Sequence, residues 1–181
     1  MILMNSKVTK TLLTHFFLHS DENLYINEMV RKFRLDKRNL VKKLKEFEKE
    51  GLFKSERIGN QVYYSLNKRY TLYEEYRKIV LKTMGIENQL ENILKGIHGV
   101  KEAYILGSYA RNKMDSASDI DLLVVGSTNA VHLHRKLAGL QKRIDREINL
   151  VNMTEKEFTM KKKENDPFIK DVFKKKRIKI I

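Results

Sequence analysis

Residues 103–125 read AYILGSYARNKMDSASDIDLLVV, and this stretch decides the fold of the C-terminal half of the chain. It begins with a short apolar run, residues 103–106, whose composition is typical of a buried strand. A second apolar run, residues 119–125, carries Asp119 and Asp121 among hydrophobic neighbours. Successive side chains of a strand point to opposite faces of a sheet, so we expect both aspartates on one face.

Gly107 and Ser108 follow the first apolar run, where the chain turns into the next helix. Glycine has no Cβ, so backbone amides and the Ser108 hydroxyl can approach a phosphate there. Two carboxylates on one strand face repel each other unless a cation lies between them. Mg²⁺ is the expected cation, because it takes oxygen ligands and is normally shared with substrate phosphates. The stretch therefore predicts half of a phosphoryl-transfer site.

The pattern G-S-Y-A-R, six further residues and S-D-I-D-L-L-V is similar to the signature of minimal nucleotidyltransferases in the DNA polymerase β superfamily. The resemblance covers residues 88–152 and implies an α/β nucleotidyltransferase domain with a small mixed sheet. It also implies a nucleoside triphosphate ligand, with ATP the expected one, and Mg²⁺ as cofactor. The nucleotide-binding residues implied are Gly107, Ser108, Arg111 and Ser118, and the metal ligands are Asp119 and Asp121.

Members of this family use a third carboxylate, on the strand after the next helix. Here that helix is expected at residues 129–145 and the strand at 147–151, and by resemblance the third position falls on Asn149. Asparagine can ligate a metal, but it does not act as a base. Glu147 lies two residues earlier on the same strand face and is the alternative. The catalytic residues predicted are Asp119, Asp121, Asn149 and Glu147.

The last part of the chain predicts two helices and a basic tail. Thr154, with Glu157 three residues later, is typical of a capping box at a helix start. Asp166 followed by Pro167 predicts the start of a second helix. The lysine-rich tail, residues 174–181, has two interpretations: it contacts nucleic acid, or it is simply solvated.

The N-terminal region has the element order of a winged helix-turn-helix. Three helices are expected at residues 7–19, 27–33 and 36–50, and a hairpin at 53–58 and 61–66. Asn27 and Asp36 are the expected N-caps of the second and third helices. Gly59 and Asn60 form a two-residue hairpin turn between the strands. This order resembles the DNA-binding domains of transcriptional regulators.

The third of these helices carries a cationic face, which predicts contact with double-stranded DNA. The DNA-binding residues predicted are Lys37, Arg38, Asn39, Lys42 and Lys43 on the helix and Arg57, Asn60 and Gln61 near the wing tip. Two alternatives remain open at this point. The basic face can be merely solvated, and the domain can serve only dimerisation or protein contact, since one fold hosts unrelated functions.

The composition supports a polyanionic partner without locating its site. The chain has 37 Lys and Arg against 23 Asp and Glu, a net charge of +14. The basic excess divides evenly at residue 70, with 15 basic against 8 acidic residues before it and 22 against 15 after it. No cysteine is present, which excludes disulfides and thiolate metal sites. The apolar run at residues 1–6 is too short for a signal peptide and no later stretch suits a membrane span, so we expect a cytoplasmic protein.

The chain is therefore predicted to be an α+β protein with an N-terminal winged helix-turn-helix at residues 1–70, connecting helices at 71–98 and the nucleotidyltransferase domain at 99–181. The amphipathic connecting helices favour a homodimer. Asn149 beside a winged helix resembles prokaryotic regulator–nucleotidyltransferase fusions. The expected function is a DNA-binding regulator that binds Mg-nucleotide with weak or no transfer. The alternatives are an active nucleotidyltransferase that modifies a protein or small molecule, and an antitoxin-like partner of a toxin.

Overall fold

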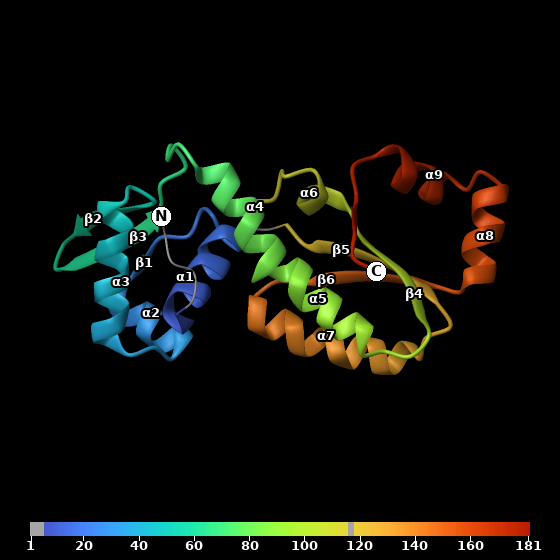
Figure 1. Cartoon of the computed structure of the whole chain (residues 1–181), viewed down its shortest axis with the longest axis horizontal. Coiled ribbons are helices and arrows are strands. Elements are labelled where there is room, and N and C mark those ends of the chain that lie inside the picture. Colours follow the sequence, from blue (N-terminus) through green and yellow to red (C-terminus); the bar gives the residue numbers. More distant parts are fainter. Residues whose placement is uncertain (1–5, 116–117) are drawn as a thin grey trace. The chain divides into compact units, whose positions relative to one another are not determined.

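The computed structural model describes residues 6–115 and 118–181 and divides into two compact units, Met1–Gly85 and Ile86–Ile181 (Figure 1). Helices and strands occur in both units, which confirms the predicted α+β class. The apolar N-terminal run, up to residue 5, and residues 116–117 of the polar loop lie outside the described residues.

The first unit combines four helices with a three-stranded antiparallel sheet. Its elements are α1 (Lys7–Leu18), β1 (Leu24–Tyr25), α2 (Ile26–Phe33), α3 (Lys37–Lys49), β2 (Phe53–Ile58), β3 (Gln61–Leu66) and α4 (Tyr73–Thr83). The strand order is β1-β3-β2. The three predicted helices and the hairpin are confirmed, and Ile58 pairs with Gln61 across the two-residue turn. Strand β1 was not predicted, because two residues are too few to show an alternating pattern.

The helix caps of this unit show one correct prediction and one wrong one. The Asp36 side chain accepts a hydrogen bond from the backbone N–H of Asn39 at 2.9 Å, so the predicted cap of α3 is confirmed. Asn27 is not a cap, because α2 begins one residue earlier and the cap position is Tyr25. Strand β1 pairs Tyr25 with Tyr63 and holds it extended, so the helix begins directly after the strand.

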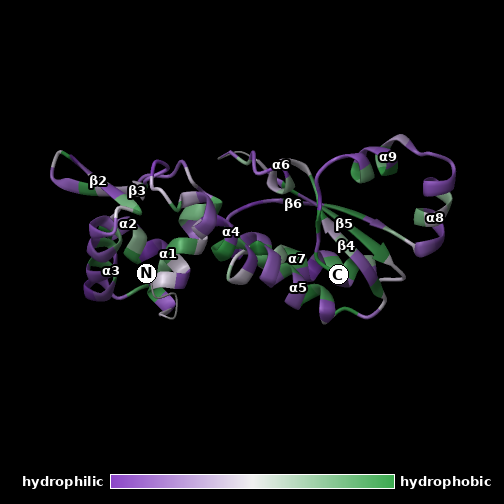
Figure 2. Ribbon diagram, turned by 45° about the horizontal axis from the view of Figure 1, so that its top comes forward, coloured by the Kyte–Doolittle hydropathy of each residue, from purple (hydrophilic) through white to green (hydrophobic). Residues whose placement is uncertain are grey.

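The core of the first unit lies between α1, α3 and the hairpin. The rings of Phe47 and Phe53 stack at 5.3 Å between centroids, and Phe16 meets Phe53 edge-on at 5.0 Å. Leu40 and Leu44 of α3 are fully buried in the same core. The rest of α3 is hydrophilic, as the purple ribbon in Figure 2 shows, so its charged face is separate from the face that packs.

The second unit is built on a four-stranded mixed sheet. Its elements are α5 (Ile86–Lys95), β4 (Val100–Ile105), α6 (Gly107–Ala110), β5 (Ile120–Gly126), α7 (Ala130–Ile144), β6 (Ile148–Met153), α8 (Glu155–Lys163), α9 (Pro167–Lys174) and β7 (Ile178–Lys179). The strand order is β6-β5-β4-β7. Strands β5 and β6 are parallel and are connected through α7, and the other pairs are antiparallel. This confirms the predicted small mixed sheet.

Helices cover both faces of this sheet (Figure 1). Leu123, Val125 and Met153 point to one face and form a core with buried residues of α8 and α9, including Phe158 and Ile169. The alternate residues of β5 are also buried, on the face where α5 and α7 lie side by side. Both helix starts predicted after residue 153 are confirmed, by the capping box of α8 and the Asp166 cap of α9.

The connecting segment and the basic tail differ from what the sequence predicts. The predicted connecting segment is divided, since α4 belongs to the first unit and α5 to the second. The end of the basic tail is strand β7, which pairs with Tyr104 and Ile105 of β4. In the part of the chain that the structure describes, no helix is both long enough and apolar enough to cross a membrane.

Candidate functional site

Gly107 and Asp121 meet at the point where β4 ends and β5 begins. Gly107 has a φ of +66°, and a Cβ built on it would lie 1.9 Å from the Asp121 Oδ2 atom. The backbone N–H of Leu106 donates to the Asp121 carbonyl at 2.8 Å, which fixes the two strands beside each other. Any side chain at position 107 would therefore displace the carboxylate, so the glycine is required by the position of Asp121.

Asn149 lies across the parallel ladder from this pair. Its backbone is in register with Asp121, and its side-chain Nδ2 donates a hydrogen bond to Asp119 Oδ2 at 3.2 Å. Ile120, between the two aspartates, is fully buried, whereas Asp119 is exposed and Asp121 half-buried. The predicted alternation is thus confirmed, and the two aspartates and Asn149 gather on one side of the strand pair.

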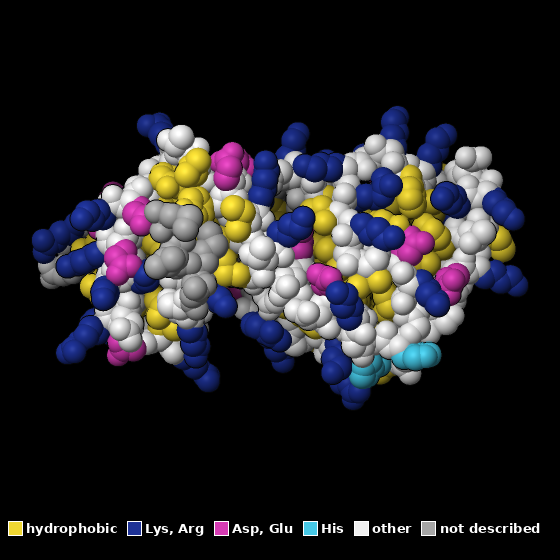
Figure 3. All heavy atoms as spheres, in the orientation of Figure 1, with side chains coloured by type: hydrophobic (Ala, Val, Ile, Leu, Met, Phe, Trp, Pro, Cys, Tyr) yellow, Lys and Arg dark blue, Asp and Glu magenta, His cyan; other side chains and the backbone are white. Residues whose placement is uncertain are grey.

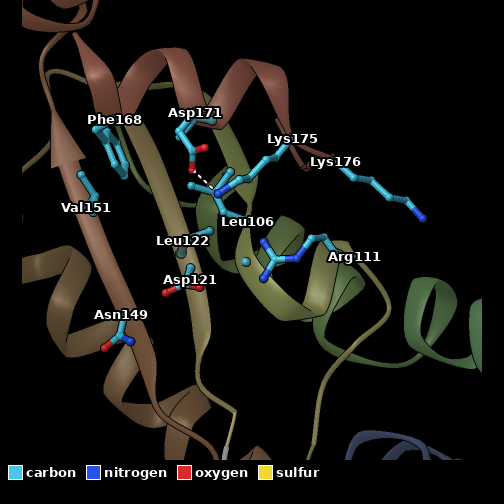
Figure 4. A pocket seen from close by; sticks show the side chains of 12 residues that line it. Leu106, Arg111, Asp121, Leu122, Asn149, Val151, Phe168, Asp171, Lys175 and Lys176 are labelled. Atoms are coloured by element: carbon cyan, nitrogen blue, oxygen red, sulfur yellow. Dashed lines mark ion pairs between the residues drawn. The ribbon is translucent and has the colours of Figure 1, made fainter.

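A cavity of about 280 Å³ opens above Asp121 and Asn149. Its wall includes Gly107, Arg111 and residues of β6 and α9. Figure 4 shows the Arg111 guanidinium reaching from the end of α6 toward this space, on the side of Asp121 away from β6. The cavity therefore brings one predicted metal ligand, Asn149 and the motif arginine together.

Glu147 and Ser118 lie in a neighbouring cavity of about 390 Å³, which Asp119 also lines. The Ser118 hydroxyl donates to Asp115 Oδ1 at 2.8 Å, and its carbonyl accepts from Arg146 at 2.6 Å. These bonds hold the loop before β5. Asp119 thus lines the cavity of Glu147, and its hydrogen bond from Asn149 links it to a residue that lines the cavity of Asp121.

Ser108 is the second residue of the short helix α6 and is half-buried. Its carbonyl accepts a hydrogen bond from the backbone N–H of Lys113 at 2.9 Å, which closes the loop after α6. Ser108 directly follows Gly107 at the end of β4, where the sequence predicts the phosphate-binding turn.

The oxygen atoms of this site suit a shared Mg²⁺ ion. Asp119 and Asp121 provide carboxylates and Asn149 an amide oxygen, which are the hard donors that Mg²⁺ prefers. Among residues 6–115 and 118–181, no group of three or more His, Cys, Asp and Glu side chains could hold a metal by itself. The donor set therefore fits an ion whose remaining ligands are water and phosphate oxygens.

The basic face of α3 is the second candidate surface. Lys37, Arg38, Asn39, Lys42 and Lys45 are exposed. Figure 3 shows Lys and Arg side chains projecting over the α3 and β2 region of the first unit.

Lys43, which the sequence assigns to the same basic face, is differently placed. It forms an ion pair with Glu46, and its ammonium lies 5.8 Å from the centre of the Phe47 ring. The hydrogen bond from Lys43 lowers the pKa of Glu46. Lys43 is therefore partly committed to contacts inside its own helix.

The hairpin residues assigned to DNA lie at an exposed turn. Arg57, Asn60 and Gln61 are exposed, and Gly59 adopts a φ of +59° in the two-residue turn. The Arg57 Nε donates to the Gly59 carbonyl at 3.3 Å, and Gln61 accepts a hydrogen bond from the Tyr63 hydroxyl at 3.0 Å. These bonds stiffen the tip and leave the Asn60 side chain in solvent.

Comparison with known proteins identifies the second unit. The family model of the nucleotidyltransferase domain matches residues 87–180. The chain belongs to this family. The matched range includes every residue that lines the two cavities. The second unit, built on the mixed sheet, is therefore a nucleotidyltransferase domain. A search of curated proteins found no significant match.

Three solved structures are similar to parts of the chain. A toxin–antitoxin structure with AMP-PNP has 25% sequence identity and a TM-score of 0.34, over 36% of this chain and 56% of its own. A mutant of the toxin–antitoxin MntA-HpeT has 21% identity and a TM-score of 0.34, over 38% and 57%. A nucleotidyltransferase from Sulfolobus solfataricus has 23% identity and a TM-score of 0.29, over 41% and 68%. The chain thus spans little more than half of the first two.

The nucleotidyltransferase domain also contains residues that the motif does not indicate. Phe168, Asp171 and Lys175 of the α9 region line the same cavity as Asp121. The sequence predicts that α9 begins at Asp166 and Pro167. The sequence does not indicate the face of the sheet on which α9 packs, because this placement depends on tertiary contacts.

Proposed function

We propose that this chain is a DNA-binding regulator whose nucleotidyltransferase domain binds a Mg²⁺–nucleoside triphosphate and transfers the nucleotidyl group weakly or not at all. The observation that carries the proposal is the hydrogen bond from the Asn149 amide to Asp119, at the position where the family resemblance implies a third carboxylate. ATP is the expected nucleotide.

Nucleotide binding would depend on residues that lie around Asp121. Gly107 and Arg111 both line the cavity, where a phosphate could approach the Gly107 backbone and Arg111 offers a guanidinium to the phosphate oxygens. Asp119 and Asp121 would hold Mg²⁺, which neutralises phosphate charge when bound. Each of these interactions favours binding of the triphosphate without requiring any transfer step.

Transfer requires a group that takes the proton of the acceptor hydroxyl. The Asn149 amide is a donor to Asp119 in this structure and does not accept a proton near neutral pH. A missing general base typically costs about 10²–10⁴-fold in rate. Binding without efficient turnover follows, and such a domain would sense nucleotide.

The first unit supports the DNA-binding part of the proposal. Three helices and a hairpin in this order resemble a winged helix-turn-helix, in which the third helix reads the major groove. On α3, the exposed Arg38 and Lys42 would contact phosphates and base edges, and the hairpin tip at Asn60 would contact the backbone. Regulators of this kind commonly read paired half-sites as dimers. Exposed Leu72 and Ile79 near α4 offer a dimer contact.

The nucleotide part is tested by equilibrium binding of labelled ATP with and without Mg²⁺. Wild-type protein should bind in a Mg²⁺-dependent manner, and the Asp119→Ala/Asp121→Ala double variant should lose at least tenfold in affinity. Lys42→Ala is the matched control, because it changes an exposed charge in the other unit. Equal binding by wild type and the double variant would refute the assignment.

The DNA part is tested by selecting bound sequences from a random duplex library and measuring their affinity by gel shift at several salt concentrations. The Arg38→Glu/Lys42→Glu variant should bind the selected duplex about 100-fold more weakly, because each lost phosphate contact reduces counterion release. Lys163→Glu/Lys174→Glu reverses two exposed charges of the second unit and serves as the control. Equal losses in both variants would indicate non-specific attraction instead.

A second candidate function is an active nucleotidyltransferase that uses Glu147 as its base. The observation that favours it is the shared cavity of Glu147 and Asp119. Incubation of the protein with labelled ATP, Mg²⁺ and a cell extract distinguishes the two functions. Strong labelling that collapses in Glu147→Gln would support the active enzyme and overturn the proposal of weak transfer.

A further inference from the structure

Helix α9 and Lys175, the residue directly after it, contribute three chemically different side chains to the cavity above Asp121. They are the aromatic ring of Phe168, the carboxylate of Asp171 and the ammonium of Lys175. The spacing of three residues places Phe168 and Asp171 on one side of the helix, and Lys175 follows where the helix ends. Figure 4 shows this order, from Phe168 beside Val151 to Lys175, whose side chain reaches toward Leu106.

The orientation of α9 is fixed by contacts at its start and on its buried side. Asp166 accepts from the backbone N–H of Ile169 at 3.1 Å and from Lys161 at 2.9 Å. The hydrogen bond from Lys161 is the main reason that the pKa of Asp166 is lowered. Ile169 and Val172 are buried in the core against the sheet. Because the helix is held at these points, its cavity side keeps one orientation.

The two ends of the cavity differ in chemistry. Phe168 and Val151 form an apolar end of the cavity. Phe168 is 40% exposed and Val151 is 38% exposed. Arg111, Lys175 and Gly107 are at the end where the phosphate-binding turn lies. A flat apolar group would cover the exposed ring at one end, and an anion would be attracted to the cations at the other.

Between these ends, Asp171 faces the cavity and pairs with Lys175 at 2.8 Å. Both side chains are more than half exposed, so the ion pair is weak and exchanges readily for a ligand. Carboxylates recognise ribose hydroxyls in other nucleotide sites. From Phe168 to the end of α9 at Lys174 the helix rises about 9 Å, so the three groups can contact different parts of an extended ligand.

We propose that α9 recognises the nucleoside part of a purine ribonucleoside triphosphate, with Phe168 stacking on the base, Asp171 bonding the ribose hydroxyls and Lys175 meeting the phosphates. This inference rests on the proposed nucleotide binding and assigns it a substrate class. The side chain beside Phe168 at this end, Val151, is hydrocarbon. Recognition of the base by stacking alone favours purines by contact area and distinguishes adenine from guanine poorly.

The test is equilibrium binding of ATP, GTP, CTP, 2′-deoxy-ATP and adenosine, with Mg²⁺, to the full chain and its variants. Wild type should bind ATP and GTP within a few-fold of each other and both more tightly than CTP. Phe168→Leu should weaken ATP and GTP roughly tenfold or more, the range of one base–aromatic stack, and Phe168→Tyr should restore most of it. Met160→Ala, an exposed apolar residue of α8, is the control.

Two variants separate the ribose and phosphate contacts. Asp171→Asn should remove the preference of roughly tenfold for ATP over 2′-deoxy-ATP, since hydrogen bonds to charged groups contribute about that factor. Lys175→Gln should weaken ATP but leave adenosine unchanged. A merely structural role for the Asp171–Lys175 pair would shift all ligands alike and would overturn the assignment.

Failure of the inference is distinguishable from failure of the proposed function. If wild type binds ATP and the Asp119→Ala/Asp121→Ala variant does not, while Phe168→Leu binds like wild type, nucleotide binding stands and the α9 inference is wrong. If wild type binds no nucleotide, both are wrong.

Discussion

Helix α3 and the strand pair β5–β6 are the two charged surfaces of greatest interest here, and they hold their charges in different ways. On α3, Arg38 and Lys42 are exposed on a helix whose opposite side forms the core. On β5–β6, Asn149 donates to Asp119, and the Asp121 carboxylate lies against Gly107. The charges of Arg38 and Lys42 can therefore be changed with little effect on the fold, whereas a change on β5–β6 disturbs a neighbour.

The largest effect is expected at the β5–β6 site, where Asn149→Asp should change the rate of nucleotidyl transfer. The substitution restores a carboxylate facing Asp119 without changing side-chain size, so transfer should rise by about 10²–10⁴-fold if the rest of the site is competent. The measurement is the initial rate of label transfer from ATP. Asn149→Ala removes the hydrogen bond without adding a base and should show no gain; a similar gain in both variants would contradict the role of the carboxylate.

Gly107→Ala should show the structural coupling of the β5 site. The new Cβ would lie 1.9 Å from Asp121 Oδ2 and would require a φ of +66°, at a cost of about 2–5 kcal/mol in unfolding free energy. Urea unfolding measures it. In an Asp121→Ala background the clash disappears, because the Asp121 Cβ is 3.5 Å away, an ordinary contact. The cost should then fall to about 1–3 kcal/mol, the strain of the backbone alone, and an unchanged cost would show that the two residues are not coupled.

Glu22 is an exception to this comparison, because it is a charged residue of the first unit that interacts with several neighbouring side chains. Burial alone would raise its pKa, but a hydrogen bond from His15 at 2.6 Å and the charges of His15, Lys32 and His19 lower the pKa of Glu22 to about 2. A carboxylate with a lowered pKa stabilises the fold above its ordinary pKa and loses this contribution as pH falls toward 2.

Glu22→Gln should therefore reduce the unfolding free energy by about 1–2 kcal/mol at pH 6, and the difference from wild type should disappear between pH 4.5 and pH 2. Urea unfolding across this pH range measures the difference. The exposed Glu56→Gln is the control and should change little at any pH. A difference for Glu22→Gln that persists at pH 2 would indicate lost packing instead of lost charge.

The smallest effect on stability is expected at Lys42. Lys42→Ala should change the unfolding free energy by less than about 0.5 kcal/mol, because the side chain is exposed. It should still reduce the slope of log affinity for DNA against log salt by about 1, the value of one phosphate contact. Lys43→Ala should do the reverse, with a larger loss of stability from its contacts with Glu46 and Phe47 and a smaller effect on the salt slope.

The sequence predicts those parts of the molecule that local rules determine. Strand alternation predicts that Asp119 and Asp121 share a face, and the helix between two strands leads to the parallel pairing that brings Asn149 beside them. The caps at Asp36 and Thr154 were predictable for the same reason, since a capping bond joins residues three positions apart.

The remainder depends on packing between distant segments. Strand β7 has two residues and no period, and it forms because β4 has a free edge beside it. Asn27 failed as a cap because Tyr25 is held by a strand that pairs with β3, more than thirty residues later. The separation of Glu147 from the cavity of Asp121 likewise depends on where the strand β6 begins, which alternation alone does not determine.

The parallel pairing of β5 and β6 has a consequence for how the protein folds. The hairpin β2–β3 closes over two residues, but Asp119 and Asn149 can meet only after the whole crossover through α7 has formed. Contacts between residues far apart in sequence form slowly, because the entropy of closing the loop is lost before the contact is gained. We expect the site around Asp119 and Asn149 to be among the last parts of the second unit to assemble, well after the helices of that unit form.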